Sequence, residues 1–90
     1  MVLLDLLGRR WALRILWELS RRPLTFRELQ SACGDISPTV LNSRLAELRE
    51  ADIVSASDAA GYSLTPEGQN LLGEFIGLHN WAERWAKRQR

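Results

Sequence analysis

Residues 24–48, LTFRELQSACGDISPTVLNSRLAEL, decide the fold of this 90-residue chain. The segment opens with the start signals of a helix. Thr25 is placed to cap that helix, and Glu28, three residues later, can bond back to the cap in a capping box. The apolar residues Leu24 and Leu29 have the spacing of a hydrophobic staple. The sequence therefore predicts a short helix that begins directly after Thr25.

A second helix follows after a tight turn. Gly34 supplies a permissive backbone at the end of the first helix. Ser37 can cap the second helix, with Pro38 at its first helical position. Ile36 and Leu41 have the spacing of a second staple. Two short helices joined in this way predict a helix-turn-helix.

The second helix has two chemically different faces. An apolar stripe with spacings of four and three residues, Leu41, Leu45 and Leu48, predicts the buried face. A rotation of 100° per residue places small and polar side chains opposite this stripe. These are Thr39, Ser43, Ala46 and Glu50, with Asn42 and Glu47 at the flanks. A helix that enters a DNA groove needs an outer face of this kind.

Further elements flank the motif. Apolar residues at helical spacing between Trp11 and Leu19 predict a helix that ends near Ser20. Residues 53–57 and 62–64 form two β-rich runs around a loop that contains Asp and Gly, which predicts a hairpin in the position of a wing.

The last helix starts at Thr65-Pro66-Glu67 and extends to about Lys87. Its apolar surface is too wide for one small domain to cover, and large exposed apolar patches mark interfaces. We therefore predict a homodimer built from the first and last helices. The predicted interface residues are Leu4, Leu7, Trp11, Leu71, Phe75, Leu78, Trp81 and Trp85. Gly73 and Gly77, four residues apart, leave a notch where another helix could approach closely.

Composition indicates a folded globular protein. Apolar residues make up 46% of the chain and charged residues 26%, and no linker or repeat interrupts it. Residues 1–90 are therefore predicted to form one domain, in which residues 65–90 are the dimerisation helix. The formal net charge is only +1, with +3 in residues 1–45, −6 in 46–83 and +4 in 84–90. DNA binding must therefore depend on the distribution of charge and not on a global basic field.

The sequence argues against several other functions. Cys33 is the single cysteine and His79 the single histidine, so we predict no disulfide, no metal cluster and no nucleophile–base pair. No glycine-rich phosphate loop follows a strand. We therefore predict a protein that is not an enzyme and that has no cofactor. The lack of a signal peptide and of a membrane span predicts a cytoplasmic protein.

Four blocks of the sequence occur in the order found in a known family. They are Gly8-Arg9-Arg10-Trp11 with Ile15-Leu16, residues 24–29, residues 36–41 with Arg44-Leu45 and Leu48, and residues 62–68. Through these blocks the chain resembles the HxlR-type regulators of bacteria, which have a MarR-like winged helix-turn-helix. The resemblance implies a mainly helical fold with a small β-hairpin and a long C-terminal helix that contributes to a dimer.

The resemblance also implies a function. It implies a homodimeric transcription factor, a repressor more often than an activator, that binds a pseudo-palindromic operator. The helix from Ser37 would lie in the major groove and the hairpin beside the adjacent minor groove. The chain departs from the family in its wing, which is usually longer and basic, whereas residues 53–64 contain no Lys or Arg. It also lacks the cysteine that the family often has near the N-terminus, so thiol sensing is not implied.

The predicted contacts with double-stranded DNA lie on the two helices of the motif. They are Ser37, Thr39, Val40, Asn42, Ser43, Arg44 and Arg27. Hydroxyl groups can hold phosphates, Asn can read adenine, and Arg can read guanine. Arg44, however, lies nearer the leucine face and also fits a structural ion pair.

A second hypothesis is a winged helix that serves as a dimerisation or protein-interaction module with reduced DNA binding, which the uncharged wing favours. The sequence also leaves open whether a small-molecule effector binds between the dimer helices.

Overall fold

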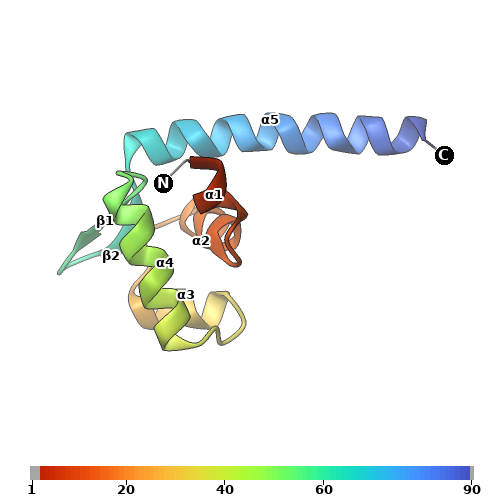
Figure 1. The fold of residues 1–90 in the computed structure, drawn as a ribbon. Helices are drawn as coiled ribbons and strands as arrows, with labels where there is room; N and C mark the ends of the chain where they lie inside the picture. Colours follow the sequence, from red (N-terminus) through yellow and green to blue (C-terminus); the bar gives the residue numbers. More distant parts are fainter. Residues whose placement is uncertain (1–2, 90) are drawn as a thin grey trace.

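Five helices and a two-stranded hairpin make up residues 3–89, which a computed structural model describes. In chain order they are α1 (Leu3–Gly8), α2 (Ala12–Leu19), α3 (Phe26–Ala32), α4 (Pro38–Glu50), β1 (Val54–Ser57), β2 (Gly61–Leu64) and α5 (Pro66–Arg88). Helix α5 lies across one end of the body formed by the other elements and extends well beyond it (Figure 1). The predicted class, mainly helical with a small hairpin, is confirmed.

The caps of the helix-turn-helix form as predicted. The Thr25 hydroxyl accepts a hydrogen bond from the Glu28 backbone N–H at 3.2 Å, and the Glu28 carboxylate accepts one from the Thr25 N–H at 2.9 Å. The Ser37 hydroxyl caps α4 by accepting from the Val40 N–H at 3.2 Å. Between the helices both Gly34 and Asp35 are left-handed, with φ of 73° and 60°. The sequence predicts a permissive backbone at Gly34 and gives no signal for Asp35.

The leucine stripe of α4 faces the core. Leu41, Leu45 and Leu48 are at most 1% exposed, and they belong to one cluster with apolar residues of α2 and α3, including Leu16 and Leu29. Full burial of each leucine contributes about 2 kcal/mol. The rotation of α4 about its own axis is therefore fixed, and its opposite face is presented outward.

The wing is attached to the segment that precedes α3. Strands β1 and β2 are antiparallel, with Val54 opposite Leu64. The backbone of Tyr62 in turn pairs with that of Leu24, through N–H to carbonyl bonds of 3.0 and 2.7 Å. Gly61 has φ of 83°, and a Cβ there would overlap the Leu24 carbonyl, so this position requires glycine. The hairpin is thus held against the helix-turn-helix by backbone bonds.

The start of α5 is fixed by polar contacts with the segment that follows α4. The Thr65 hydroxyl accepts from the Gly68 N–H at 3.0 Å and donates to the Asp52 carbonyl at 2.6 Å, while the Thr65 N–H donates to the Ile53 carbonyl at 3.0 Å. A Cβ at Gly68 would overlap that same carbonyl. Leu72, one turn later, is buried. The first two turns of α5 therefore belong to the body of the domain.

One prediction about the N-terminal region is wrong. The apolar spacing placed Trp11 inside a helix, but the chain breaks there into α1 and α2, and Trp11 is left-handed with φ of 78°. An aromatic residue adopts this conformation rarely. The indole is half-buried and packs against the core cluster, which compensates for the strain. The resulting turn, Arg9-Arg10-Trp11, brings two arginines close to α4.

Candidate nucleic-acid interface

The outward face of α4 is polar and accessible. Thr39, Asn42 and Ser43 are exposed in the first two turns of the helix, opposite the buried leucines. Hydroxyl and amide groups at the start of a recognition helix contact phosphates and base edges. Helix α4 thus presents short polar side chains outward, and its buried leucines on the opposite side fix its orientation.

The other predicted contacts have more varied environments. Ser37 is exposed, but its hydroxyl oxygen already caps α4. Val40 is half-buried and packs against the core cluster. Arg27 is exposed near the start of α3, and no salt bridge to it occurs within residues 3–89. The Arg27 side chain is therefore available to a phosphate, whereas the Val40 side chain is only partly accessible to solvent.

Arg44 is engaged inside the protein. Its Nε donates to the carbonyl of Arg10 at 3.0 Å, and its guanidinium pairs with Glu47. Glu47 is also paired with Arg9 at 2.9 Å. The Arg44 side chain is only 18% exposed. This arrangement matches the structural ion pair considered for Arg44 and leaves its guanidinium turned toward the α1–α2 turn.

The charge around the polar face is nearly balanced. The wing contributes no cation, and its tip carries Asp58. Arg22, before α3, is paired loosely with Glu28 at 3.4 Å. The backbone N–H and hydroxyl of Thr25 lower the pKa of Glu28, so this carboxylate stays charged beside Arg22. Few positive charges therefore remain for phosphates near α4.

A second accessible surface is apolar and lies on α5 and α2. The exposed large side chains are Trp17, Ile76, Leu78, Trp81 and Trp85, which are 40–61% exposed. A groove of about 450 Å³ runs between the two helices and is lined by Leu13, Arg14, Trp17, Phe75, Ile76, His79 and Asn80. Apolar side chains dominate this surface, and patches of this kind mark interfaces.

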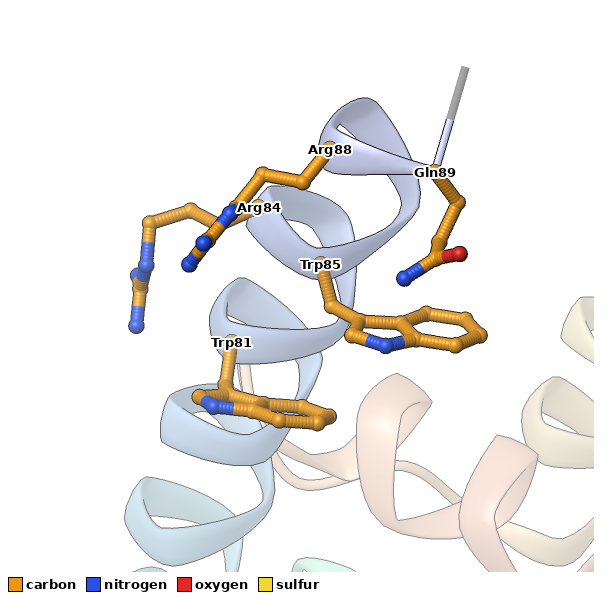
Figure 2. A pocket seen from close by; sticks show the side chains of 5 residues that line it. All are labelled: Trp81, Arg84, Trp85, Arg88 and Gln89. Atoms are coloured by element: carbon orange, nitrogen blue, oxygen red, sulfur yellow. The ribbon is translucent and has the colours of Figure 1, made fainter.

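The far end of α5 carries a pair of stacked tryptophans. The ring centroids of Trp81 and Trp85 are 6.3 Å apart and their planes differ by 11°. Figure 2 shows the two rings one helical turn apart, beside a hollow also lined by Arg84, Arg88 and Gln89. The segment that carries them, residues 81–85, belongs to the part of α5 that projects past the body (Figure 1).

The predicted interface residues divide into two groups. Leu7, Trp11 and Leu71 are half-buried and pack against the core of their own chain. Phe75 is half-buried and lines the groove between α2 and α5. Leu78, Trp81 and Trp85 are exposed. The Leu4 side chain lies outside the described residues.

The prediction omitted two exposed residues, Trp17 and Ile76. Trp17 follows the buried pair Ile15 and Leu16 on α2, so its place off the core face was a signal that could have identified it.

Residues 6–90 match the family described as HxlR-like helix-turn-helix. The chain belongs to this family. An uncharacterized HTH-type transcriptional regulator of Bacillus subtilis strain 168, YvaP, is 30% identical over 87 residues, covering 90% of this chain and 81% of YvaP.

Solved structures are similar as well. Quinone-bound YodB from B. subtilis has a TM-score of 0.82 at 34% identity over 89% of both chains. A MarR-family regulator from Enterococcus faecalis V583 has a TM-score of 0.88 at 28% identity over 96% of this chain and 84% of that one.

Membership in the HxlR-like family defines the general activity. These proteins are transcriptional regulators with a winged helix-turn-helix, a class of DNA-binding proteins and not of enzymes. None of the helices in residues 3–89 has the length together with the apolar character that a membrane span requires. The predicted family and the predicted fold class are both confirmed.

The single cysteine of this HxlR-like chain is part of the core. Cys33 is 2% exposed at the end of α3. Burial raises the pKa of its thiol, which disfavours the reactive thiolate. His79 is exposed on α5, with its Nε2 3.7 Å from Glu83. Neither residue belongs to the polar face of α4.

Proposed function

We propose that this HxlR-like protein is a homodimeric, sequence-specific DNA-binding repressor. Helix α4 would enter the major groove of a pseudo-palindromic operator in the cytoplasm. The observation that carries the proposal is the two-faced α4, because buried Leu41, Leu45 and Leu48 fix the helix while Thr39, Asn42 and Ser43 face outward. Repression is the commoner activity implied by the family resemblance.

The dimer is proposed from the apolar surface of α5. Leu78, Trp81 and Trp85 are more than half exposed, and α5 extends past the body of its own chain (Figure 1). A second copy would cover these side chains with an identical surface, as expected for a twofold dimer. Residues 1–90 would then act as one domain whose segment 65–90 is the dimerisation helix. Two copies of α4 would occupy half-sites about 34–36 Å apart.

The charge distribution predicts an unusual salt dependence. With no Lys or Arg in residues 53–64, we expect few phosphate contacts per subunit. The logarithm of the binding constant falls with the logarithm of salt concentration by about 0.9 for each neutralised phosphate. The slope should therefore be shallow for a dimer of this class. A steep slope would show that the cations of residues 84–90 take the missing role.

The proposal is tested by selecting duplexes from a random-sequence DNA pool with the wild-type protein. We expect an enriched palindromic sequence. Binding to DNA from immediately upstream of the protein's own gene is tested separately. Substituting Thr39→Glu together with Ser43→Glu should abolish specific binding because both carboxylates would face the groove. The matched control is Gln69→Glu with Asn70→Glu, which adds the same charge at exposed positions of α5. Loss of binding in the control alone would contradict the proposal.

A second candidate function is an interaction module without specific DNA binding. The cation-free wing favours it. Under this hypothesis no sequence is enriched from the pool even at low salt, and Thr39→Glu with Ser43→Glu leaves partner binding unchanged.

Repression itself is tested by placing the enriched sequence upstream of a reporter gene, where the wild-type protein should lower transcription and the double variant should not.

A further inference from the structure

We propose that Arg44 and Glu47 are positioning residues, which orient α4 for DNA reading by tying it to the turn Arg9-Arg10-Trp11 and do not themselves contact DNA. This inference rests on the proposed function. It replaces the direct contact that the sequence suggested for Arg44 with an indirect role.

The contacts span two distant parts of the chain. Arg44 Nε donates to the Arg10 carbonyl at 3.0 Å, across 34 positions in the sequence. Glu47 binds Arg9 at 2.9 Å and also pairs with Arg44. Within residues 3–89, these are the side-chain bonds that join α4 to another element. Both end on neighbouring residues of a single turn, so α4 is clamped at one point.

The contacts of Arg44 with the Arg10 carbonyl and of Glu47 with Arg9 are called the clamp below. On α4 the clamp residues lie between the buried and the exposed face. Arg44 and Glu47 are 18% and 21% exposed, intermediate between the buried leucines and the exposed Thr39 and Ser43. Arg9, the partner of Glu47, is 46% exposed, so solvent screens that ion pair more than it screens the bond from Arg44 to the Arg10 carbonyl. The leucines fix the rotation of α4, and the clamp adds a directional bond near the middle of the helix.

The receiving turn has one defined shape. Trp11 is left-handed at φ 78°, and its half-buried ring also lies 5.4 Å below the Arg10 guanidinium. A strained non-glycine residue persists only where surrounding contacts hold it. The direction of the Arg10 carbonyl, which receives the bond from Arg44, is set by this conformation. The turn therefore offers α4 a rigid acceptor.

Glu47→Gln separates positioning from direct contact by the sign of its effect. If Arg44 contacted phosphate, loss of the Glu47 charge would release it, and affinity for every DNA would rise. If Glu47 positions α4, the affinity for the enriched duplex falls by about tenfold relative to a scrambled duplex of the same composition. Nonspecific binding depends on charge and not on the fit of α4, so the ratio of the two affinities is the readout.

Two substitutions at Arg44 complete the test. Arg44→Lys keeps the charge but lacks the planar fork that serves a carbonyl and a carboxylate together, so we expect the same loss of specific affinity. Arg44→Gln removes the charge, and we expect the salt slope to stay unchanged. A wild-type affinity for Arg44→Lys, or a slope smaller by about 0.9 per subunit in Arg44→Gln, would overturn the inference. Arg49→Lys, on the exposed side of the same helix, is the control.

A measurement without DNA keeps the inference independent of the proposed function. A double-mutant cycle combines Arg9→Ala and Glu47→Gln. The effect of the double variant on the unfolding equilibrium constant should differ from the product of the two single effects by at least about twofold. Multiplicative effects would show that the turn and α4 are not coupled, and would overturn the inference. If the cycle shows coupling but no duplex is enriched, the proposed function fails while the clamp stands.

Discussion

Helices α4 and α5 are both amphipathic, but only α4 has its apolar stripe covered by its own chain. Leu41, Leu45 and Leu48 are at most 1% exposed, whereas on α5 burial ends at Leu72 and Leu78 is 61% exposed. The α4 stripe and the α5 stripe Leu71, Phe75 and Leu78 both repeat at spacings of four and three residues. The same pattern therefore leads to opposite environments, because the leucines of α4 pack into one core cluster with apolar residues of α2 and α3, while α5 projects past the body (Figure 1).

This difference separates stability from assembly. The apolar side chains of α4 stabilise the folded chain at any concentration, and the helix is then free to use its polar face. The apolar side chains of the projecting part of α5 contribute little until another surface covers them. Their effect should depend on protein concentration, as expected for linked folding and association.

The largest expected effect comes from truncating the α4 stripe. Leu45→Ala leaves a cavity in the core, and we expect the unfolding free energy to fall by about 2–5 kcal/mol at every protein concentration. Leu78→Ala should cost less than about 0.5 kcal/mol in dilute protein, because its side chain is exposed. Denaturant unfolding at several concentrations measures both. Equal losses in dilute protein would break the comparison.

The next effect concerns assembly through the projecting part of α5. Trp81→Glu places a charge in the proposed dimer interface, so the dimer dissociation constant should rise at least thirtyfold, about 2 kcal/mol for an interface hot spot. Sedimentation velocity measures the change. Lys87→Ala, at an exposed position near the same end of α5, should leave association unchanged. A dimer of undiminished affinity in Trp81→Glu would place the interface elsewhere.

A smaller effect of opposite sign is expected at Gly73. No heavy atom lies within 4 Å of a Cβ built there, so Gly73→Ala should raise the unfolding free energy by about 1 kcal/mol through helix propensity. Thermal unfolding of dilute protein is the measurement. A loss of stability would mean that the exposed side of α5 is already packed. Association measured alongside shows whether the notch at Gly73 and Gly77 receives a partner helix, since the added methyl group would weaken that contact.

The smallest effect is the pH dependence of the α3 cap. Thr25 holds the pKa of Glu28 below its ordinary value. The unfolded chain therefore binds this proton more readily, so the contribution is complete above the unfolded pKa, about 4.3, and is lost as the pH falls through the lowered folded value. Glu28→Gln should be less stable than wild type near pH 7, and the difference should shrink in acid. A pH-independent difference in urea unfolding would contradict this.

Local signals predicted most of the fold. Thr25 with Glu28, Ser37 with Pro38, and Thr65 with Pro66 lie within a few residues of the bonds they make, so their roles can be inferred from spacing alone. The polar face of α4 follows from helical periodicity in the same way. The exposure of Thr39 and Ser43 was predictable because their position depends only on the leucines beside them.

Contacts between distant segments could not be predicted. The break at Trp11 leaves the apolar spacing nearly intact, and its left-handed backbone is held by tertiary packing. The bond from Arg44 to Arg10 joins residues 34 positions apart, and the pairing of Leu24 with Tyr62 joins the wing to a segment without its own strand signal. The turn at Trp11 and the bond to the Arg10 carbonyl decide the environment of Arg44, so the sequence alone could not show that this side chain is engaged inside the protein.

The close approach of Gly68 to the Ile53 carbonyl fixes the position of the first turn of α5. The 23 residues of α5 span about 34 Å at 1.5 Å per residue. Tilting the helix by about 10° at its first turn would move the far end by about 6 Å, a displacement larger than the roughly 3.4 Å step between bases along one strand. In a dimer joined through the far ends of α5, the close packing at Gly68 would thus influence the distance between the two copies of α4.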